Sequence, residues 1–360
     1  VRDLLCGINP KDFDIATNAT PNEIRKIFKA SRIIGRRFKL VHIFSKSELI
    51  EVATFRSGDD HDNEGHFLKD QSGKILRDNI WGTLEQDTFR RDFTINALYY
   101  CPLSGKVEDH NSGIKHIKDK KIISIGDPLK RFSEDPVRSL RAIRFSNKLN
   151  FKIDKNIKDA IYKKGHLLSN ISNARIFDEF CKMFLNGLGE KNFKKLVSFG
   201  LNKYLLVTSH NESDISKKLI NEALRNTDSR VKNNQSVTPG FLIAAMLWPE
   251  LLKRSSKNRE INLRKYFRSM DQILRSQQKI TAIPRKFHTY IKDIWVLQLK
   301  LHSRIGKQPY KTVNHPRFRA AYDFLLVRER ACDCKGVLGD WWTKFQKNDR
   351  IQQKSLIAEL

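Results

Sequence analysis

One short stretch, Lys11-Asp12-Phe13-Asp14-Ile15-Ala16-Thr17, constrains the chain more than any other. Two acids one residue apart on an extended strand point to the same face, and Phe13 between them would point to the opposite face and anchor in a core. Like charges this close repel, and each is costly to desolvate. A bound cation would explain why both are kept, and carboxylate oxygens suit Mg²⁺. For a lone Asp-x-Asp the alternative is a solvated loop.

The charge balance points to a polyanionic partner. The 360 residues include 68 Lys and Arg against 40 Asp and Glu, a formal net charge of +28. A field of this sign favours nucleic acid or an anionic membrane surface. Because the chain is rich in Lys, Asn and Ile, some of the lysines can reflect the base composition of the gene. The sign of the net charge is therefore better evidence of a polyanionic partner than its magnitude.

The cysteines indicate a reducing compartment. Their number is odd, and their spacing matches no zinc or disulfide framework: Cys6, Cys101, Cys181, Cys332 and Cys334. We therefore expect reduced thiols in a cytoplasmic protein. The sequence has no apolar run long enough to span a bilayer and no visible signal peptide.

The first part of the chain alternates helix and strand signals. Thr20, Pro21 and Glu23 predict a capped helix over 21–28. Strands are expected at 39–44 and 49–55, and the second carries Glu51 within an apolar run. If this strand pairs near the Asp-x-Asp, Glu51 becomes a third acid of the metal site. An edge strand with Glu51 facing water is an equally good interpretation.

A second polar cluster follows a polar, Gly-containing segment (57–73) that we interpret as a mobile flap. Over 88–100, Phe93, Ala97 and Tyr100 are spaced as on one helical face. Donors and acceptors for phosphate and sugar lie in the same segment: Arg90, Arg91, Asp92 and Asn96. A turn at 109–113 and a strand at 121–125 are expected next.

The rest of the chain reads mostly as helices. The first runs from about Asp135 to Leu149 with Pro136 in its first turn, and it carries a basic stripe: Arg138, Arg141 and Arg144. Arginine can clamp phosphate or donate to a base edge, whereas an Asp135–Arg138 ion pair on a solvated face is the simpler alternative. We expect a linker at 226–239, a helix at 241–252 capped by Thr238, and Trp341-Trp342 in a core.

Five motifs in one order resemble the class II template-independent nucleotidyltransferases, namely the bacterial poly(A) polymerases and CCA-adding enzymes. They are Asp12-Phe13-Asp14, 51–56, 90–98, 109–113 and 134–145. Each is weak alone, but five in register are specific. Two later segments, 293–299 and 315–323, resemble the poly(A) polymerase branch, so the resemblance covers nearly the whole chain.

The resemblance implies an α+β protein with a small mixed-sheet head followed by an all-α neck and body. The expected parts are an N-terminally truncated catalytic head at 1–125, a helical neck with a base-reading helix at 126–200, a helical RNA-binding body at 201–330 and a C-terminal helical segment at 331–360. The implied reaction adds AMP from ATP to RNA 3′ ends, releases pyrophosphate and serves RNA polyadenylation and decay.

The resemblance also implies roles for particular residues. Asp12 and Asp14 would hold two Mg²⁺ ions, with Glu51 or Asp92 as the third catalytic carboxylate. The expected nucleotide-binding residues are Arg2, Asp3, Arg91, Asn96, Asp135, Arg138 and Arg141. Of these, Asp135 and Arg138 would read the base edge in place of a template. Expected partners are RNA 3′ ends, ATP and RNA-decay proteins, without a membrane.

Two departures from the family keep alternatives open. The Gly-Gly pair that the family carries before Val-Arg-Asp, where backbone amides approach the triphosphate, is absent because the chain begins at Val1 without Met. We expect upstream residues to be missing. A basic tail after Leu360 is also absent, which would weaken RNA affinity. The alternatives are a CCA-adding enzyme and a non-catalytic RNA-binding relative.

Overall fold

The structure is a computed structural model that describes residues 1–10, 12–35, 39–45, 48–57, 68–69, 75–77, 81–207, 213–257, 260–334 and 336–360. Most of the segment expected to form a flap, 57–73, lies outside these residues. The chain divides into two compact units, Val1–Lys164 and Gly165–Leu360, and each is described separately below. The finer division into four parts stays a prediction.

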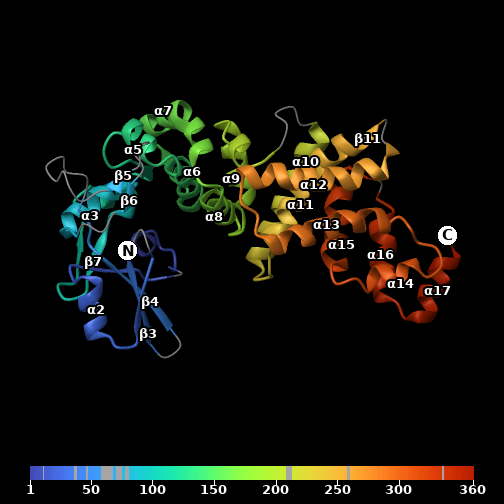
Figure 1. The fold of residues 1–360 in the computed structure, drawn as a ribbon, viewed down its shortest axis with the longest axis horizontal. Coiled ribbons are helices and arrows are strands. Elements are labelled where there is room, and N and C mark those ends of the chain that lie inside the picture. The colour runs from blue at the N-terminus through green and yellow to red at the C-terminus, as the bar shows by residue number, and fades with distance from the viewer. Residues whose placement is uncertain are drawn as a thin grey trace. The chain divides into compact units, whose positions relative to one another are not determined.

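The first unit contains strands β1 to β10 and helices α1 to α7 (Figure 1). Its elements are α1 (Arg2–Leu5), β1 (Ile15–Thr17), α2 (Pro21–Ile27), β2 (Ser31–Ile34), β3 (Leu40–Ser45), β4 (Glu48–Thr54), β5 (Leu68–Lys69), β6 (Ile75–Arg77), α3 (Leu84–Arg90), η1 (Thr94–Asn96), β7 (Tyr99–Cys101), β8 (Lys106–Glu108), α4 (Gly113–Lys118), β9 (Lys121–Ile122), α5 (Pro128–Glu134), α6 (Val137–Leu149), β10 (Lys152–Ile153) and α7 (Lys155–Lys164).

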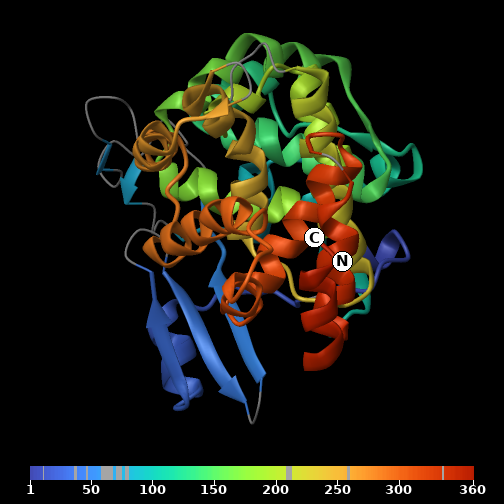
Figure 2. The same ribbon diagram turned by 90° about the vertical axis from the view of Figure 1, so that its right-hand side faces the viewer.

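A four-stranded mixed sheet organises the head. Its order is β1-β4-β3-β2, with β1 parallel to β4 and the other pairs antiparallel; the blue strands lie side by side in Figure 2. One face is apolar because Val41 and Val52 are cross-strand partners and both are buried. Ile24 of α2 packs against them. The capping box predicted at Thr20 and Glu23 is confirmed and fixes the start of α2.

The prediction of one continuous helical face over 88–100 is wrong. Helix α3 ends at Arg90, and the chain becomes extended at Arg91 and at Phe93, which bridges to Ser124. A 3₁₀ turn and strand β7 follow. Phe93 and Ala97 are buried, as the apolar pattern predicts, but Tyr100 is 55% exposed on β7. The pattern identified the buried residues, whereas packing against 123–125 decided the backbone conformation.

Helix α6 confirms the predicted neck helix. It spans Val137–Leu149, begins after Pro136 as its N-cap and ends at Asn150, whose φ of 55° is left-handed. Its apolar side is fully buried at Leu140 and Ile143. The same helix therefore packs into the core along one side and presents its arginines along another.

The second unit is almost entirely helical. Its elements are η2 (Gly165–Asn170), α8 (Asn173–Phe184), α9 (Gly189–Ser198), η3 (Asn202–Tyr204), α10 (Asp214–Lys232), α11 (Pro239–Ser255), β11 (Ser256–Lys257), β12 (Glu260–Ile261), α12 (Leu263–Ile280), α13 (Arg285–Lys300), α14 (Gln308–Val313), α15 (Phe318–Arg330), α16 (Leu338–Lys347) and α17 (Arg350–Ala358). The two units together confirm the predicted α+β class. None of the described helices combines the length and apolar character needed to cross a bilayer.

The linker predicted at 226–239 is mostly helix. Helix α10 continues to Lys232, so only 233–238 connects it to α11, which Thr238 caps as predicted. The polar residues of this segment suggested a linker, but some of their side chains form hydrogen bonds inside the protein. Asp228 is buried and accepts hydrogen bonds from the backbone N–H groups of Gly189 and Glu190, at 2.7 and 3.0 Å.

The tryptophan pair is a core anchor, as predicted. Trp342 is fully buried and donates from Nε1 to the carbonyl of Leu301 at 3.0 Å. The rings of Trp341 and Phe345 stack at 4.8 Å in the same cluster. This cluster holds α16 against α13 and α15.

Candidate active site

Asp12 and Asp14 lie immediately before strand β1 rather than on it. Both side chains are exposed, and no described residue forms a hydrogen bond or an ion pair with either carboxylate. Phe13 is 70% exposed, so the expectation that it anchors in the core is wrong. Two exposed carboxylates without protein partners are a donor set that fits Mg²⁺, which keeps waters and substrate oxygens in its remaining shell.

Glu51 lies on β4, the strand next to β1. The parallel register pairs Ile15 of β1 with Val52 of β4. If the same pairing is extended by one residue toward the N-terminus of both strands, Asp14 lies beside Glu51. Strand β4 is central in the sheet, so the alternative is wrong about the edge position, although the side chain of Glu51 does face water, at 49% exposed. The carboxylate of Glu51 lies 3.2 Å from Nε2 of His42 on β3. The described residues contain no group of three or more Asp, Glu, His or Cys side chains placed to hold one metal ion.

Asp92 is the centre of a buried polar network. Its Oδ2 accepts from Arg141 Nε at 2.6 Å, and its Oδ1 accepts from Asn96 Nδ2 and from the N–H of Phe93, both at 2.8 Å. Burial alone would raise the pKa of Asp92, but the charge of Arg141 and these hydrogen bonds outweigh it, so the pKa lies below its ordinary value. Asp92 therefore stays ionised and holds Asn96 and Arg141.

The beginning of the chain extends this network. Arg2 donates from Nη1 to Asn96 Oδ1 and from Nε to Asp3 Oδ1, and Lys148 Nζ donates to Asp3 Oδ2 at 2.7 Å. Lys148 and Arg141 are seven residues apart on α6, two turns along one side. The polar network thus links α1, the segment after α3, and α6. It brings together five of the predicted residues: Arg2, Asp3, Asp92, Asn96 and Arg141.

Arg91 belongs to a different cluster. Its Nη2 donates to Asp87 Oδ2 at 2.8 Å, and its Nε donates to the hydroxyl of Tyr99 at 3.0 Å. Burial would raise the pKa of Asp87, but Arg91 and the hydrogen bonds of Tyr99 and the Arg56 N–H lower it below its ordinary value. The side chain of Arg91 is therefore engaged with α3 and β7, and not with Asp92 beside it.

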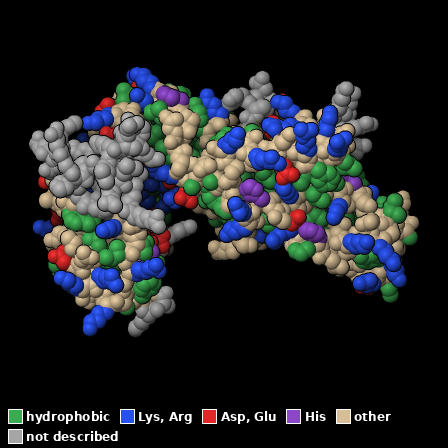
Figure 3. All heavy atoms as spheres, viewed as in Figure 1, with side chains coloured by type: hydrophobic (Ala, Val, Ile, Leu, Met, Phe, Trp, Pro, Cys, Tyr) green, Lys and Arg blue, Asp and Glu red, His purple; other side chains and the backbone are tan. Residues whose placement is uncertain are grey.

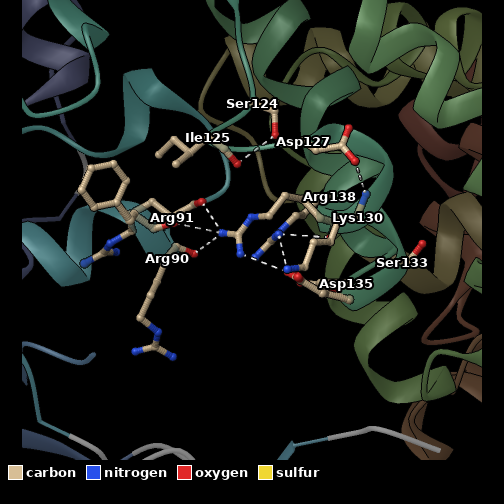
Figure 4. A network of polar contacts seen from close by, with 12 residues as sticks. Arg90, Arg91, Ser124, Ile125, Asp127, Lys130, Ser133, Asp135 and Arg138 are labelled. Atoms are coloured by element: carbon tan, nitrogen blue, oxygen red, sulfur yellow. Dashed lines mark hydrogen bonds and ion pairs between the residues drawn. The ribbon is translucent and has the colours of Figure 1, made fainter. Parts of the chain in front are cut away.

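Arg131 joins α5 to the end of α3. Its Nη2 lies 2.8 Å from the carbonyl oxygens of both Arg90 and Arg91. In Figure 4 these carbonyl groups point toward this contact, the side chains of Arg90 and Arg91 point away from it, and Arg138 lies beside it. Arg138 in turn donates to the carbonyl of Arg131 at 3.1 Å. Carbonyl groups at a helix C-terminus lack helical partners, so a cation there is stabilising.

Asp135 and Arg138 lie on either side of the junction between α5 and α6: Asp135 is the C-cap of α5, and Arg138 is in the first turn of α6. Asp135 Oδ1 accepts from the Val137 N–H at 3.2 Å, and Arg138 Nη1 lies 3.6 Å from Glu134. Burial, and then the charge of Arg131, lower the pKa of Arg138, although Asp135, Asp92 and Glu134 act in the opposite direction. The predicted base-reading pair is thus present at this junction, within a cluster of charges.

Sequence reasoning missed several residues that build these clusters. Arg131, Asp87, Tyr99 and Lys148 were not among the candidates. A signal existed for three of them: Lys148 follows Arg141 by seven residues, Arg131 precedes Arg138 by seven, and Asp87 precedes Arg91 by four, the spacing of an ion pair on a helix. Tyr99 gave no such signal because its contact with Asp87 crosses from a strand to a helix.

Solved structures of known proteins share this fold. The Bacillus stearothermophilus CCA-adding enzyme in complex with CTP matches with a TM-score of 0.62 and 24% identity, over 100% of this chain and 76% of that one. A tRNA nucleotidyltransferase complexed with a primer tRNA and an incoming ATP analog matches with a TM-score of 0.65 and 18% identity, over 96% of this chain and 93% of that one. The chain therefore has the same fold as these two proteins.

Sequence comparisons define the family more closely. The poly A polymerase head domain matches residues 1–123, the "Probable RNA and SrmB- binding site of polymerase A" matches 150–209, and the polymerase A arginine-rich C-terminus matches 260–360. Poly(A) polymerase I of Escherichia coli O157:H7 is 40% identical over all of this chain and 80% of its own length. The chain therefore belongs to the bacterial poly(A) polymerase family, and it is a nucleotidyltransferase.

Two further relatives show how the family branches. Poly(A) polymerase I of Haemophilus influenzae is 40% identical over 100% of this chain and 82% of its own. A CCA-adding enzyme of Lactococcus lactis is 30% identical over 92% of this chain and 75% of its own. The predicted resemblance to the poly(A) polymerase branch is confirmed by the higher identity over the full chain.

Proposed function

We propose that this enzyme adds AMP from ATP to the 3′ ends of RNA, without a template and with release of pyrophosphate. The observation that carries the proposal is the 40% identity to poly(A) polymerase I over the whole chain. Two solved proteins of the same fold are complexes with CTP or with tRNA and an ATP analog, which supports a nucleotide and an RNA as substrates. The net charge of +28 agrees with an RNA substrate.

Asp12 and Asp14 are the proposed metal ligands. They are exposed, lack protein partners among the described residues and precede a strand beside Glu51. Bound Mg²⁺ would neutralise triphosphate charge and lower the pKa of the attacking 3′ hydroxyl. We propose two ions, with Glu51 or Asp92 as the third carboxylate. Glu51 is the better placed of the two, because Asp92 already accepts three hydrogen bonds.

The polar network around Asp92 is the proposed sugar and phosphate site. Asp92 fixes Asn96 and Arg141, and Arg141 remains 31% exposed, so part of its guanidinium can meet a phosphate. Arg2 and Asp3 border the same network through Asn96. Positioning and charge neutralisation of this kind account for most of the catalysis of phosphoryl transfer.

Asp135 and Arg138 are the proposed readers of the base edge. Asp135 offers an acceptor just before α6 and Arg138 offers a donor in its first turn, a combination that can distinguish adenine from other bases. Arg91 is proposed to bind the nucleotide only after leaving Asp87, because its side chain is engaged in the present arrangement. RNA-decay proteins as partners, and a cytoplasmic location, are part of the same proposal.

The test compares nucleotides and primers. The protein is incubated with Mg²⁺ and with ATP alone or with ATP and CTP, on either an unstructured RNA or a tRNA that lacks its terminal nucleotides. A long ladder with ATP alone on the unstructured RNA is expected. A product that stops after three additions and requires both CTP and the tRNA would instead assign CCA addition.

Arg131 gives a first prediction for this site. Arg131→Lys keeps the charge but loses the planar fork, whose Nη2 donates to the Arg90 and Arg91 carbonyls while Nη1 donates to Glu134. We expect the KM for ATP to rise about tenfold, since about 1.4 kcal/mol of a charge-assisted hydrogen bond would be lost from the segment that holds Asp92. The KM for RNA should change little.

The control is Arg25→Lys, the same exchange at an exposed position of α2. It should leave both KM values at the wild-type level. Equal changes in the KM values for ATP and RNA in Arg131→Lys would indicate a general loss of structure and contradict a positioning role.

A further inference from the structure

A groove lies between α14 and α17, far along the chain from the residues discussed above. It has a volume of about 480 Å³, and its lining includes Lys307, Tyr310, Lys311, Asn314, Arg350 and Lys354. All of it belongs to the second unit. Figure 1 shows α14 and α17 next to each other, and Figure 3 shows Lys and Arg side chains gathered over them.

The four cations of this groove lack acidic partners. No acidic residue lines the groove, and none of the four cations has an ion pair with any described residue. Elsewhere in the same unit cations are neutralised, as where Arg225 contacts both Glu190 and Glu222. Four like charges around one groove repel one another. A polyanion would remove this repulsion and gain four contacts.

The surroundings of Tyr310 indicate that the groove binds the phosphate groups of a polyanion and not its bases. The guanidinium of Arg350 lies 5.3 Å from the centre of its ring, and the ring of Phe345 lies 5.5 Å away. The ring is thus occupied by neighbours instead of being free to stack on a base. Its hydroxyl is buried, so the donors that the groove can offer are those of its lysine and arginine side chains. Such a lining suits phosphate groups and is indifferent to base sequence.

We propose that this groove, defined by Lys307, Lys311, Arg350 and Lys354, binds the phosphate backbone of the RNA substrate. The inference rests on the proposed function, because a growing RNA is the polyanion that such an enzyme meets in every cycle. Cationic side chains bind phosphates through release of condensed counterions, and the affinity then falls linearly with salt on logarithmic axes. The groove therefore supplies a sequence-independent, salt-sensitive part of RNA binding.

The test measures RNA binding without nucleotide. Fluorescence anisotropy of a labelled A20 RNA gives Kd over a range of NaCl concentrations for wild type and for Lys311→Gln/Lys354→Gln. Each phosphate contact contributes about 0.7 to the logarithmic salt slope on a single strand, so losing two should reduce the slope by about 1.4. At 0.15 M salt this corresponds to a Kd raised about tenfold. A U20 RNA should give the same change.

The matched control is Lys253→Gln/Lys279→Gln, which removes the same charge from exposed positions of α11 and α12. It should keep the wild-type slope. An unchanged slope in the groove variant, or an equal loss in the control, would overturn the proposal. Groove-dependent binding of polyglutamate without groove-dependent binding of RNA would assign an acidic protein instead. Because no nucleotide is added, a failure of AMP addition would leave this result intact.

Discussion

Asp14→Ala is expected to abolish AMP incorporation while leaving RNA affinity close to the wild-type value. The carboxylate is exposed and has no partner among the described residues, so its removal breaks no internal contact and should leave the melting temperature unchanged. If it holds Mg²⁺, its loss removes several kcal/mol of transition-state stabilisation, which corresponds to at least about 10³-fold in rate. Primer extension with ATP and anisotropy with A20 RNA measure the two quantities separately.

The control for this variant is Asp159→Ala, which removes an exposed carboxylate from α7 in the same unit. Its extension rate should equal that of wild type. Ordinary turnover by Asp14→Ala would end the metal hypothesis. Asp12→Ala should behave as Asp14→Ala does, and a large difference between them would show that the two carboxylates do not share one site.

Local signals in the sequence predicted much of the head. The Thr20 capping box and the strands around Val41 and Val52 follow from neighbouring residues alone, so they were predictable. Phe13 was not, because alternation along a strand applies only within a strand, and β1 begins after Asp14. The same limit explains the segment at 88–100, where contact between Phe93 and Ser124 overrode a helical spacing.

The candidate site was predicted as a set of residues but not as a set of contacts. Spacing along α6 placed Arg138 and Arg141 on a helix, yet nothing local indicated that Arg141 would contact Asp92. Arg91 and Asp92 are adjacent, but the extended backbone between them sends their side chains to different clusters. Partners that arrive from 40 or more residues away depend on packing, which a sequence pattern does not encode.

Asp92→Ala is the second variant with a large expected effect. Removing the carboxylate deprives Arg141 of an ion pair and Asn96 of a hydrogen bond in a site where Asp92 is only 7% exposed. Breaking a buried ion pair at one end typically costs about 3–5 kcal/mol. We expect a loss of this size in the free energy of unfolding, measured with urea, together with a fall of about 10²-fold or more in AMP incorporation because Asn96 and Arg141 lose their orientation.

The double variant Asp92→Ala/Arg141→Met separates stability from function. Replacing both charges removes the unpaired cation, so most of the lost stability should return, whereas incorporation should stay low. Recovery of incorporation together with stability would make the pair purely structural.

The pH dependence of stability gives an independent check on the charge of Asp92. Because the pKa of Asp92 is lowered in the folded protein, its stabilising effect is complete above its ordinary value of about 4 and is lost as the pH falls through the lower folded value. The difference in unfolding free energy between wild type and Asp92→Ala should therefore shrink below about pH 4, and a difference that stayed constant there would contradict the ionised pair.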